Sequence, residues 1–372
     1  MTGTIRVLHV VPDLEFGGLQ RLVVDMARLT SGDGFDCAIL ALGALGPLAD
    51  QVKTDRLLVG GPQPAWSMIW PGRLAAKVAS FSPTVVHTHS GVWYKASLAA
   101  RQAGVRRIIH TDHGRRRPDP WIDRLVDGLA SRRTDVVVAV SETLGQYLAR
   151  AVVHDRAAVR VIMNGVDTSL FRPGADRPLR SELGIAPEAL ILGSIGRLEP
   201  IKGYDVMIEG FAKLREGPLG GRTILVLAGD GSERLRLEQR VAQLGLSQAV
   251  RFLGWRSDLG RLYSTFDVFA LTSRSEGTSV SLLEAMSSAL CPVVTDVGGN
   301  RAVLGAELAQ QLVPANDPEA IAAGWTAALL NAERRHAIGR LARRRVETDF
   351  SLGAMVGAYQ QVYRSLVSRH PS

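Results

Sequence analysis

The sequence predicts an α/β protein made of two Rossmann-like, doubly wound domains, one after the other. Two observations predict this class. Short β-branched runs alternate with amphipathic stretches almost from end to end, and the alternation pauses once, at residues 171–185 (FRPGADRPLRSELGI). A chain of 372 residues also suits two domains of ordinary size better than one. We therefore expect domains at 1–170 and 171–350, then a C-terminal helix at 351–372 that packs back toward the first domain.

The strand candidates are continuous apolar runs, which are typical of a parallel sheet covered by helices on both faces. In the first half they are Ile5–Val11, Asp36–Leu42, Thr84–Thr88, Arg107–Thr111, Asp135–Val140 and Val159–Met163. In the second half they are Leu190–Ile195, Thr223–Ala228, Val250–Leu253, Val268–Leu271 and Pro292–Thr295. Helical patterns separate the strands, among them Leu19–Leu29, Arg73–Phe81, Val92–Ala103 and Trp121–Ser131, and a last one covers Leu352–Val367. Ligands of open α/β sheets bind beyond the carboxyl ends of the strands. With two such domains facing one another, we expect the site in the cleft between them.

Composition favours a globular protein of a reducing compartment. Hydrophobic residues make up 46% of the chain and charged residues 22%. The two cysteines, Cys37 and Cys291, lie in apolar strand-like surroundings, so we expect buried, reduced thiols. The N-terminus runs straight into a strand pattern without a signal peptide, and no apolar stretch reaches the roughly 18 residues that span a bilayer. The expected location is cytoplasmic.

Positive charge is unevenly placed along this chain, whose formal net charge is +8. Residues 101–133 hold nine arginines and four aspartates, so 9 − 4 = +5. Such a cluster could bind nucleic acid, an anionic lipid surface or a phosphorylated substrate, or could simply be a solvated face. The nucleic-acid interpretation is disfavoured because no DNA-binding motif is found.

The most informative segment is SEGTSVSLLEAM, residues 275–286, which follows a predicted strand. Glu276 lies in the loop and Glu284 about one turn inside the next helix, for which Thr278 or Ser279 is the predicted N-cap. The amides and the positive dipole end of that helix start suit a phosphate. A loop carboxylate beside it could accept hydrogen bonds from a sugar, and a helix carboxylate could bind a ribose diol. Taken alone, the two glutamates could also be ordinary solvated charges.

Cations occur at a second strand end, in GRLEPIKG at residues 196–203. Arg197 and Lys202 lie there in a glycine-flanked loop near a helix start, an arrangement that suits a departing diphosphate. Gly229-Asp230-Gly231 ends the next strand, and its glycines would let the backbone approach a ligand closely. By itself this GDG turn is a weak signal.

With these motifs assembled, the second half resembles the family-4 retaining glycosyltransferases of GT-B fold. The resemblance rests on the E-x7-E pair, the Arg197/Lys202 loop, the GDG turn and Gly298-Gly299. The first half agrees through Gly17-Gly18, HTHS at 87–90, HTDHG at 110–114, Ser141-Glu142 and the Asn164-Gly165-Val166-Asp167 segment. Nearly the whole chain is covered, in the family's order.

The resemblance implies transfer of a hexosyl unit from a UDP- or GDP-linked sugar, with retention of configuration, to a lipid-linked or polysaccharide acceptor of cell-surface glycan synthesis. It implies no metal and no cofactor beyond the nucleotide-sugar donor. Arg197 and Lys202 would bind the diphosphate, Glu284 the ribose, and Glu276 and His113 the donor sugar near the reaction centre. The remaining donor-binding positions that it implies are Gly17, Gly18, Gly229, Gly231, Gly277, Thr278, Ser279 and Val280.

The first half has further polar candidates. His87, His89 and His110 are interpreted mainly as structural groups at strand ends, and His89, Arg115 and Arg116 are also the acceptor-side candidates. Zinc is disfavoured because neither an H-E-x-x-H motif nor a cysteine ligand set is present. The arginine cluster suggests an acceptor carrying lipid pyrophosphate, or an anionic membrane surface.

This sequence departs from the family pattern at three places, which leave the donor open. Thr278-Ser279 replace a Phe-Gly, Ala302 stands where a glutamate is usual, and Ala289 replaces a glycine. Two alternatives to a transferase remain. A nucleotide-sugar epimerase of the same fold would turn over its substrate without an acceptor, and a non-catalytic sugar-nucleotide-binding protein would bind without turnover.

Overall fold

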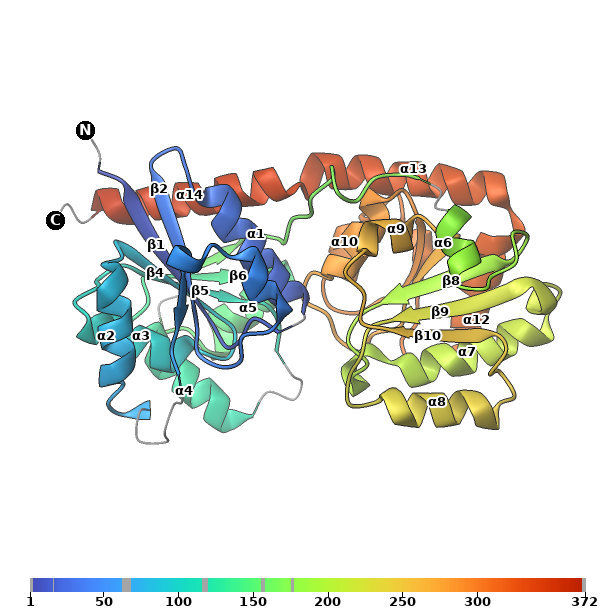
Figure 1. The fold of residues 1–372 in the computed structure, drawn as a ribbon, viewed down its shortest axis with the longest axis horizontal. Helices are drawn as coiled ribbons and strands as arrows, with labels where there is room; N and C mark the ends of the chain where they lie inside the picture. The colour runs from blue at the N-terminus through green and yellow to red at the C-terminus, as the bar shows by residue number, and fades with distance from the viewer. Residues whose placement is uncertain are drawn as a thin grey trace. The chain divides into compact units, whose positions relative to one another are not determined.

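The computed structural model describes residues 3–15, 17–61, 68–115, 120–154, 158–174 and 177–369. The chain forms two compact units, shown in Figure 1. Unit 1 comprises Met1–Asn164 and Leu352–Ser372, and unit 2 comprises Gly165–Ser351. The first division therefore falls a few residues before the position 170 expected from the proline-bearing segment. The C-terminal helix belongs to unit 1.

Unit 1 contains a parallel sheet in the order β3-β2-β1-β4-β5-β6-β7. Its strands are β1 (Ile5–Val11), β2 (Phe35–Ala41), β3 (Leu57–Val59), β4 (Val85–His89), β5 (Ile108–Asp112), β6 (Val136–Ala139) and β7 (Val159–Val161). Its helices are α1 (Gly18–Thr30), α2 (Gly72–Phe81), α3 (Trp93–Gln102), α4 (Trp121–Ser131), α5 (Glu142–Ala151) and α14 (Leu352–Arg369). All the strands expected in this half are confirmed within one or two residues, and β3 was not expected.

Alternate side chains of these strands pack into separate apolar cores, as a doubly wound sheet requires. Val7, Val85 and Ile109 pack with α1 and α14, whereas Leu8, Val86 and Ile108 pack with α2 and α3. In Figure 1, α14 (red) lies beside α1 on one side of the sheet, and α2 and α3 lie on the other. The end of the chain thus completes the core of unit 1.

Unit 2 repeats the plan with the strand order β10-β9-β8-β11-β12-β13. Its strands are β8 (Leu190–Ile195), β9 (Thr223–Ala228), β10 (Val250–Gly254), β11 (Val268–Leu271), β12 (Cys291–Thr295) and β13 (Leu312–Val313). Its helices are α6 (Arg177–Glu182), α7 (Tyr204–Glu216), α8 (Arg234–Gln243), α9 (Leu259–Tyr263), α10 (Val280–Ser287), α11 (Asn300–Leu304), α12 (Pro318–Leu330) and α13 (Ala332–Asp349). The five strands expected here are confirmed, and the two-residue β13 was not expected.

Two smaller predictions are also confirmed. Cys37 and Cys291 are free, buried thiols, and burial raises the pKa of each to about 12, so both are protonated at neutral pH. Within the described residues, no helix combines the length and apolar character that crossing a bilayer requires.

Candidate functional site

The residues singled out in the second half gather at one edge of the unit 2 sheet. In that sheet β8 lies between β9 and β11, so the strand order reverses at β8, where ligands of open α/β sheets bind. The loops after β8, β9, β11 and β12 leave the same edge because the strands are parallel. These four loops carry Arg197, Lys202, the GDG turn, Glu276 and the Gly298-Gly299 pair.

Lys202 and Glu276 form an ion pair across the switch point between β8 and β11. The Lys202 Nζ donates to Glu276 Oε1 at 2.6 Å, and the Ser273 hydroxyl donates to the same oxygen at 2.6 Å. The Glu276 side chain is only 8% exposed, so this carboxylate would be costly without its partners. The loops that the sequence made candidates are therefore tied together by charge.

Arg197 differs from Lys202. It is exposed in the loop after β8, and within the described part of the chain no side chain or backbone oxygen pairs with its guanidinium. A guanidinium presents a planar fork of donors that suits a phosphate. Arg197 is thus a cation available to an anionic ligand at the edge where Lys202 and Glu276 meet.

Helix α10 follows the loop of Glu276, and its N-cap is Ser279, one of the two predicted candidates. The Ser279 hydroxyl accepts from the Leu282 backbone N–H at 3.4 Å. Glu284 lies one turn further on and is 4% exposed, and the Tyr263 hydroxyl donates to its Oε2 at 2.8 Å. Tyr263 holds this carboxylate in place, which makes an ordinary solvated charge the wrong interpretation of Glu284. Thr278 is buried beside the cap.

Two glycines of the motifs are required by close backbone packing. Gly229 has a φ of 134°, and a Cβ there would lie 1.9 Å from the Gly196 carbonyl oxygen. Gly298 has a φ of 53°, and its Cβ would lie 1.8 Å from the Glu276 carbonyl oxygen. Any larger residue would push apart the loops that hold Arg197 and Glu276. These glycines act on neighbouring loops as well as leaving room for a ligand.

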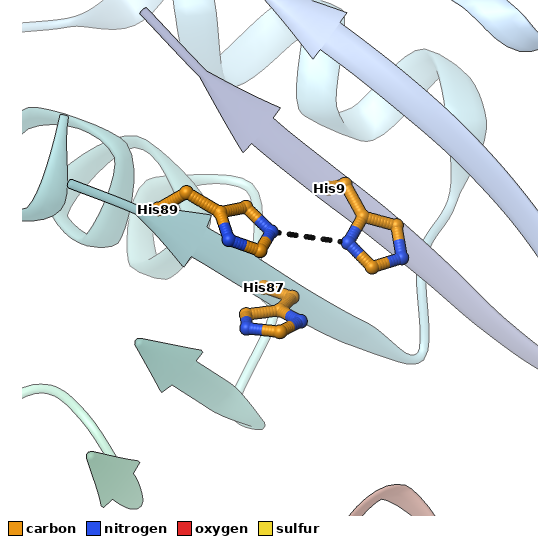
Figure 2. A group of neighbouring side chains, drawn as sticks. All are labelled: His9, His87 and His89. Carbon is orange, nitrogen blue, oxygen red and sulfur yellow. Dashed lines mark hydrogen bonds between the residues drawn. The ribbon is translucent and has the colours of Figure 1, made fainter. Parts of the chain in front are cut away.

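The corresponding switch point in unit 1, between β1 and β4, is built from histidines. Figure 2 shows His9 on β1 beside His87 and His89 on β4. All three are fully buried, and one ring nitrogen of each lies within 4.8 Å of the others, a spacing that could suit a metal ion. Five of the six ring nitrogens, all but His9 Nε2, already have partners in the protein, however. His9 Nδ1 pairs with His89 Nε2 at 3.2 Å, and His87 pairs with the hydroxyls of Tyr363 and Thr111, each at 2.7 Å.

His113 follows β5 and joins this group through its Nε2, which lies 3.1 Å from His89 Nδ1. Its backbone N–H donates to the Ser90 hydroxyl at 2.9 Å. Burial lowers the pKa of His113 to about 4 and that of His9 to about 3, and it lowers the pKa of His87 and His89 well below the usual value. The whole cluster is neutral at pH 7.

The acceptor-side candidates lie in constrained surroundings. His89 is fully buried with both ring nitrogens engaged. Arg115 is 10% exposed and donates to Asp112 at 2.7 Å and to Asp127 at 2.6 Å. Arg116 lies outside the described residues. Contact of an acceptor with His89 or Arg115 would require these bonds to break, so this role stays a prediction that the packing does not favour.

The remaining predicted residues lie where their elements begin or end. Gly17 and Gly18 start α1 directly after the β1 loop, and Gly277 accepts from the Gly299 N–H at 3.0 Å. His110 packs its ring flat on Trp93, with centroids 4.0 Å apart, and pairs with the Thr88 hydroxyl at 2.9 Å. That arrangement agrees with a structural role for His110.

Sequence reasoning missed His9, Tyr263 and the two tyrosines of α14. His9 stands alone in an apolar strand, and only the parallel register, in which it lies opposite His87, reveals its partners. Tyr359 and Tyr363 reach the same network from the far end of the chain, where Tyr359 pairs with Thr111 at 3.1 Å. The i, i+4 spacing of Tyr359 and Tyr363 was the available signal, but their partners could not be read from the sequence.

Two family models match the chain in succession. The model described as "Glycosyltransferase Family 4" matches residues 16–170, and the model described as "Glycosyl transferases group 1" matches residues 176–345. The two matches meet near the division between the units.

Known relatives cover most of the chain. A protein of Bacillus subtilis named as a glycosyltransferase, EpsF, is 31% identical over 78% of this chain and 79% of the relative. The UDP-Gal:alpha-D-GlcNAc-diphosphoundecaprenol alpha-1,3-galactosyltransferase of Escherichia coli is 25% identical over 84% of this chain and 85% of the relative. The crystal structure of the Anabaena HepE protein in complex with UDP and glucose matches 98% of this chain and all of that chain (100%), with a TM-score of 0.85 at 21% identity. At that identity the likeness shows the fold, and the predicted GT-B class is confirmed.

Proposed function

This chain belongs to glycosyltransferase family 4, and on that premise we propose that it transfers a hexosyl unit from a UDP- or GDP-linked sugar to an acceptor of cell-surface glycan synthesis. The observation that carries the proposal is Arg197, which has no partner within the described residues and lies at the same sheet edge as the Lys202–Glu276 ion pair and the start of α10. A cation without a partner in the described part of the chain, a paired cation and a set of helix amides suit a diphosphate ester. The Escherichia coli relative takes UDP-galactose and the Anabaena protein binds UDP, which supports a uridine donor.

Each site residue has a proposed task that its surroundings support. Arg197 and Lys202 bind the diphosphate and stabilise it as it departs. Glu276 accepts from donor-sugar hydroxyls, for which Lys202 and Ser273 hold its carboxylate in place. Glu284, oriented by Tyr263, accepts from the ribose hydroxyls. The amides of residues 277–280 meet the sugar and the distal phosphate.

The proposed transfer retains the anomeric configuration and proceeds on the front face of the sugar. The departing diphosphate, steadied by Arg197 and Lys202, takes the acceptor proton as the new glycosidic bond forms. In this scheme the protein contributes positioning and charge stabilisation, and it needs no metal. Proton NMR of the anomeric signal is the test of retention, and a β-linked product from an α-linked donor would refute it. An EDTA-sensitive rate would refute metal independence.

The proposed acceptor is a lipid diphosphate-linked or polysaccharide intermediate at the inner face of the cytoplasmic membrane. The Escherichia coli relative acts on a diphosphoundecaprenol-linked sugar, which supports this class. A surface of unit 1 supports it as well. Trp121, Ile122, Leu125 and Leu129 of α4 are 66%, 54%, 57% and 37% exposed and lie along one side of the helix.

We propose that this face of α4 rests on an anionic bilayer. Large exposed apolar side chains beside cations are typical of interfacial helices. Arg124 on the helix and Arg132 at its end are exposed. The cluster that the sequence suggested is smaller than it looked, because Arg101 donates to the backbone oxygens of Arg133 and Arg106 and Arg115 is buried in ion pairs.

The donor is tested by thermal shift with UDP-glucose, GDP-mannose and dTDP-glucose, in the native protein, Arg197→Ala and Arg222→Ala. Arg222 is an exposed arginine at the start of β9, at the opposite edge of the same sheet, and serves as the matched control. A ligand at 100 times its Kd stabilises the fold by about 2.7 kcal/mol. We expect one donor to stabilise the native protein and Arg222→Ala but not Arg197→Ala. Stabilisation by none would contradict the proposal, turnover without an acceptor would indicate an epimerase, and binding without turnover would indicate a non-catalytic protein.

A further inference from the structure

The histidines of unit 1 form a linear chain of ring-to-ring hydrogen bonds. It runs from His9 Nδ1 to His89 Nε2 at 3.2 Å, and from His89 Nδ1 to His113 Nε2 at 3.1 Å. Figure 2 shows the first of these bonds, with the rings of His9 and His89 edge to edge across the two neighbouring strands. His87 lies beside the chain but is not part of it, since both its nitrogens pair with hydroxyls.

Each bond in this chain carries one hydrogen, because the rings are neutral. A neutral imidazole has one N–H and one unprotonated nitrogen, so a ring that donates through one nitrogen accepts through the other. The middle ring, His89, uses both nitrogens and transmits the direction from one bond to the next. Only two arrangements exist: every bond is donated from His9 toward His113, or every bond is donated the other way.

The buried end of the chain decides between them. His9 Nε2 is fully buried and has no hydrogen-bond partner among the described residues. If the bonds were donated toward His9, this nitrogen would carry an N–H with nothing to receive it. If they are donated away from His9, it carries only an unused lone pair. Orphaned buried N–H groups are rarer than unsatisfied acceptors, so the second arrangement is favoured.

The consequence appears at the other end, in His113. Its Nε2 accepts from His89 and is unprotonated, so its proton sits on Nδ1. His113 is only partly buried, and its Nδ1 has no partner among the described residues. We propose that His9 and His89 are positioning residues that hold His113 as the Nδ1–H tautomer, a hydrogen-bond donor toward the ligand and not a base. The ligand-facing part of this inference rests on the proposed function, and the tautomer itself does not.

The proposal is tested in the full chain, labelled with ¹⁵N-histidine, by long-range ¹H–¹⁵N correlation at pH 7. This measurement reports which nitrogen of each ring carries the proton. The protein has 8 histidines, and the loss of one set of signals in His113→Gln assigns His113. We expect His113 with its proton on Nδ1, the tautomer that free histidine disfavours in water. A proton on Nε2 of His113 in the native protein would overturn the proposal without any variant.

Two variants separate the effect of the hydrogen-bonded histidines from that of their surroundings. In His9→Phe the first donor is lost, and the preference of His113 for Nδ1–H should fall roughly five- to tenfold, as expected for one neutral hydrogen bond. Tyr363→Phe is the matched control. It removes an equally buried hydroxyl from His87 and leaves the hydrogen bonds between His9, His89 and His113 intact. An unchanged His113 tautomer in a folded His9→Phe, or an equal change in Tyr363→Phe, would contradict the proposal. UDP-glucose binding is titrated separately, so failure of the donor assignment and failure of the tautomer assignment are distinguishable.

Discussion

The two units place very different chemistry at the same position of the same fold. In unit 1 the switch point between β1 and β4 holds neutral, buried imidazoles. In unit 2 the switch point between β8 and β11 holds an ion pair and a guanidinium, that of Arg197, with no partner among the residues that the structure describes. The histidines lie within the strands, where burial removes their charge, whereas Arg197, Lys202 and Glu276 lie in loops beyond the strand ends. A fold thus supplies an edge where ligands can bind, and the depth of the side chains decides whether that edge is charged.

The largest expected effect is a loss of stability of unit 1 in acid, caused by its neutral histidine cluster. The folded pKa of His9 is lowered from 6.5 to about 3, so its contribution to stability is fully present above pH 6.5 and is lost as the pH falls toward 3. At about 1.4 kcal/mol per pKa unit, His9 alone lowers the free energy of unfolding by roughly 3 kcal/mol between pH 6.5 and pH 4. The lowered pKa values of Asp205 and Asp258 in unit 2 start from 3.8, so their contribution is lost only at lower pH.

Acid should therefore open unit 1 before unit 2. Hydrogen exchange read peptide by peptide at pH 7, 5.5 and 4.5 measures this, after correction for the intrinsic exchange rate. Peptides of β1 and β4 should lose protection first, with those of β8 and β11 as the internal control. Equal loss in both units, or earlier loss in unit 2, would remove the contrast.

The next effect concerns the charged switch point. In Lys202→Met the Glu276 carboxylate keeps its burial but loses its cation, and the departing diphosphate loses a donor. Removing one such group lowers kcat by about 100- to 1,000-fold. UDP release at saturating donor measures it. Lys213→Met is the control, since Lys213 of α7 pairs with the exposed Glu319 of α12. A kcat within a few-fold of the native value would mean that Lys202 only serves the fold.

The two glutamates of unit 2 should separate from each other. Glu284→Gln weakens a contact to an unchanging part of the donor, so the donor KM rises while kcat is unchanged. The expected fall in kcat/KM is roughly 10- to 150-fold. Glu276→Gln should mainly lower kcat, because its bonds strengthen as charge develops on the sugar.

Tyr263→Phe offers a check on Glu284. It removes the hydroxyl that orients this carboxylate, so it should reproduce the KM effect in weaker form. Donor titration at saturating acceptor gives both constants for all three variants. A lower kcat with unchanged KM in Glu284→Gln, or no change in Glu276→Gln, would reverse the assignment of roles.

The smallest effect concerns α4. Each basic residue near an anionic surface contributes about 1 kcal/mol, so Arg124→Ala and Arg132→Ala should each weaken vesicle binding about fivefold at low salt. Arg222→Ala in unit 2 should change nothing. Sedimentation with phosphatidylglycerol and with phosphatidylcholine vesicles, at low and high salt, measures this. Equal binding to both vesicle types, or to neither, would exclude the anionic surface as partner.

Strands and charged loops could be predicted from the sequence, but contacts between strands could not. The long apolar runs such as Val268–Leu271 were found because buried parallel strands are apolar throughout. The short edge strands β3 and β13 were missed because three and two residues carry no period. Charged residues that follow a predicted strand can be read directly from the sequence, which is how Arg197, Lys202 and Glu276 were found.

His9 shows the limit of that reasoning. Its environment depends on the register between β1 and β4, which two apolar strands do not encode in any local pattern. The role of Tyr263 was invisible for a similar reason, since its partner Glu284 lies on another element of unit 2. Both contacts depend on tertiary packing rather than on local sequence.

The position of α14 at the end of the chain sets an order of events during synthesis. Its Tyr359 and Tyr363 complete the core and the polar network of unit 1, yet they follow the whole of unit 2, residues 165–351. The ribosome must therefore add 351 − 164 = 187 residues between the first part of unit 1 and its last helix. At about 5–20 residues per second this takes on the order of 10–40 s. During that interval the face that bears His9 and His87 is uncovered on the nascent chain, and unit 2 can finish folding before unit 1.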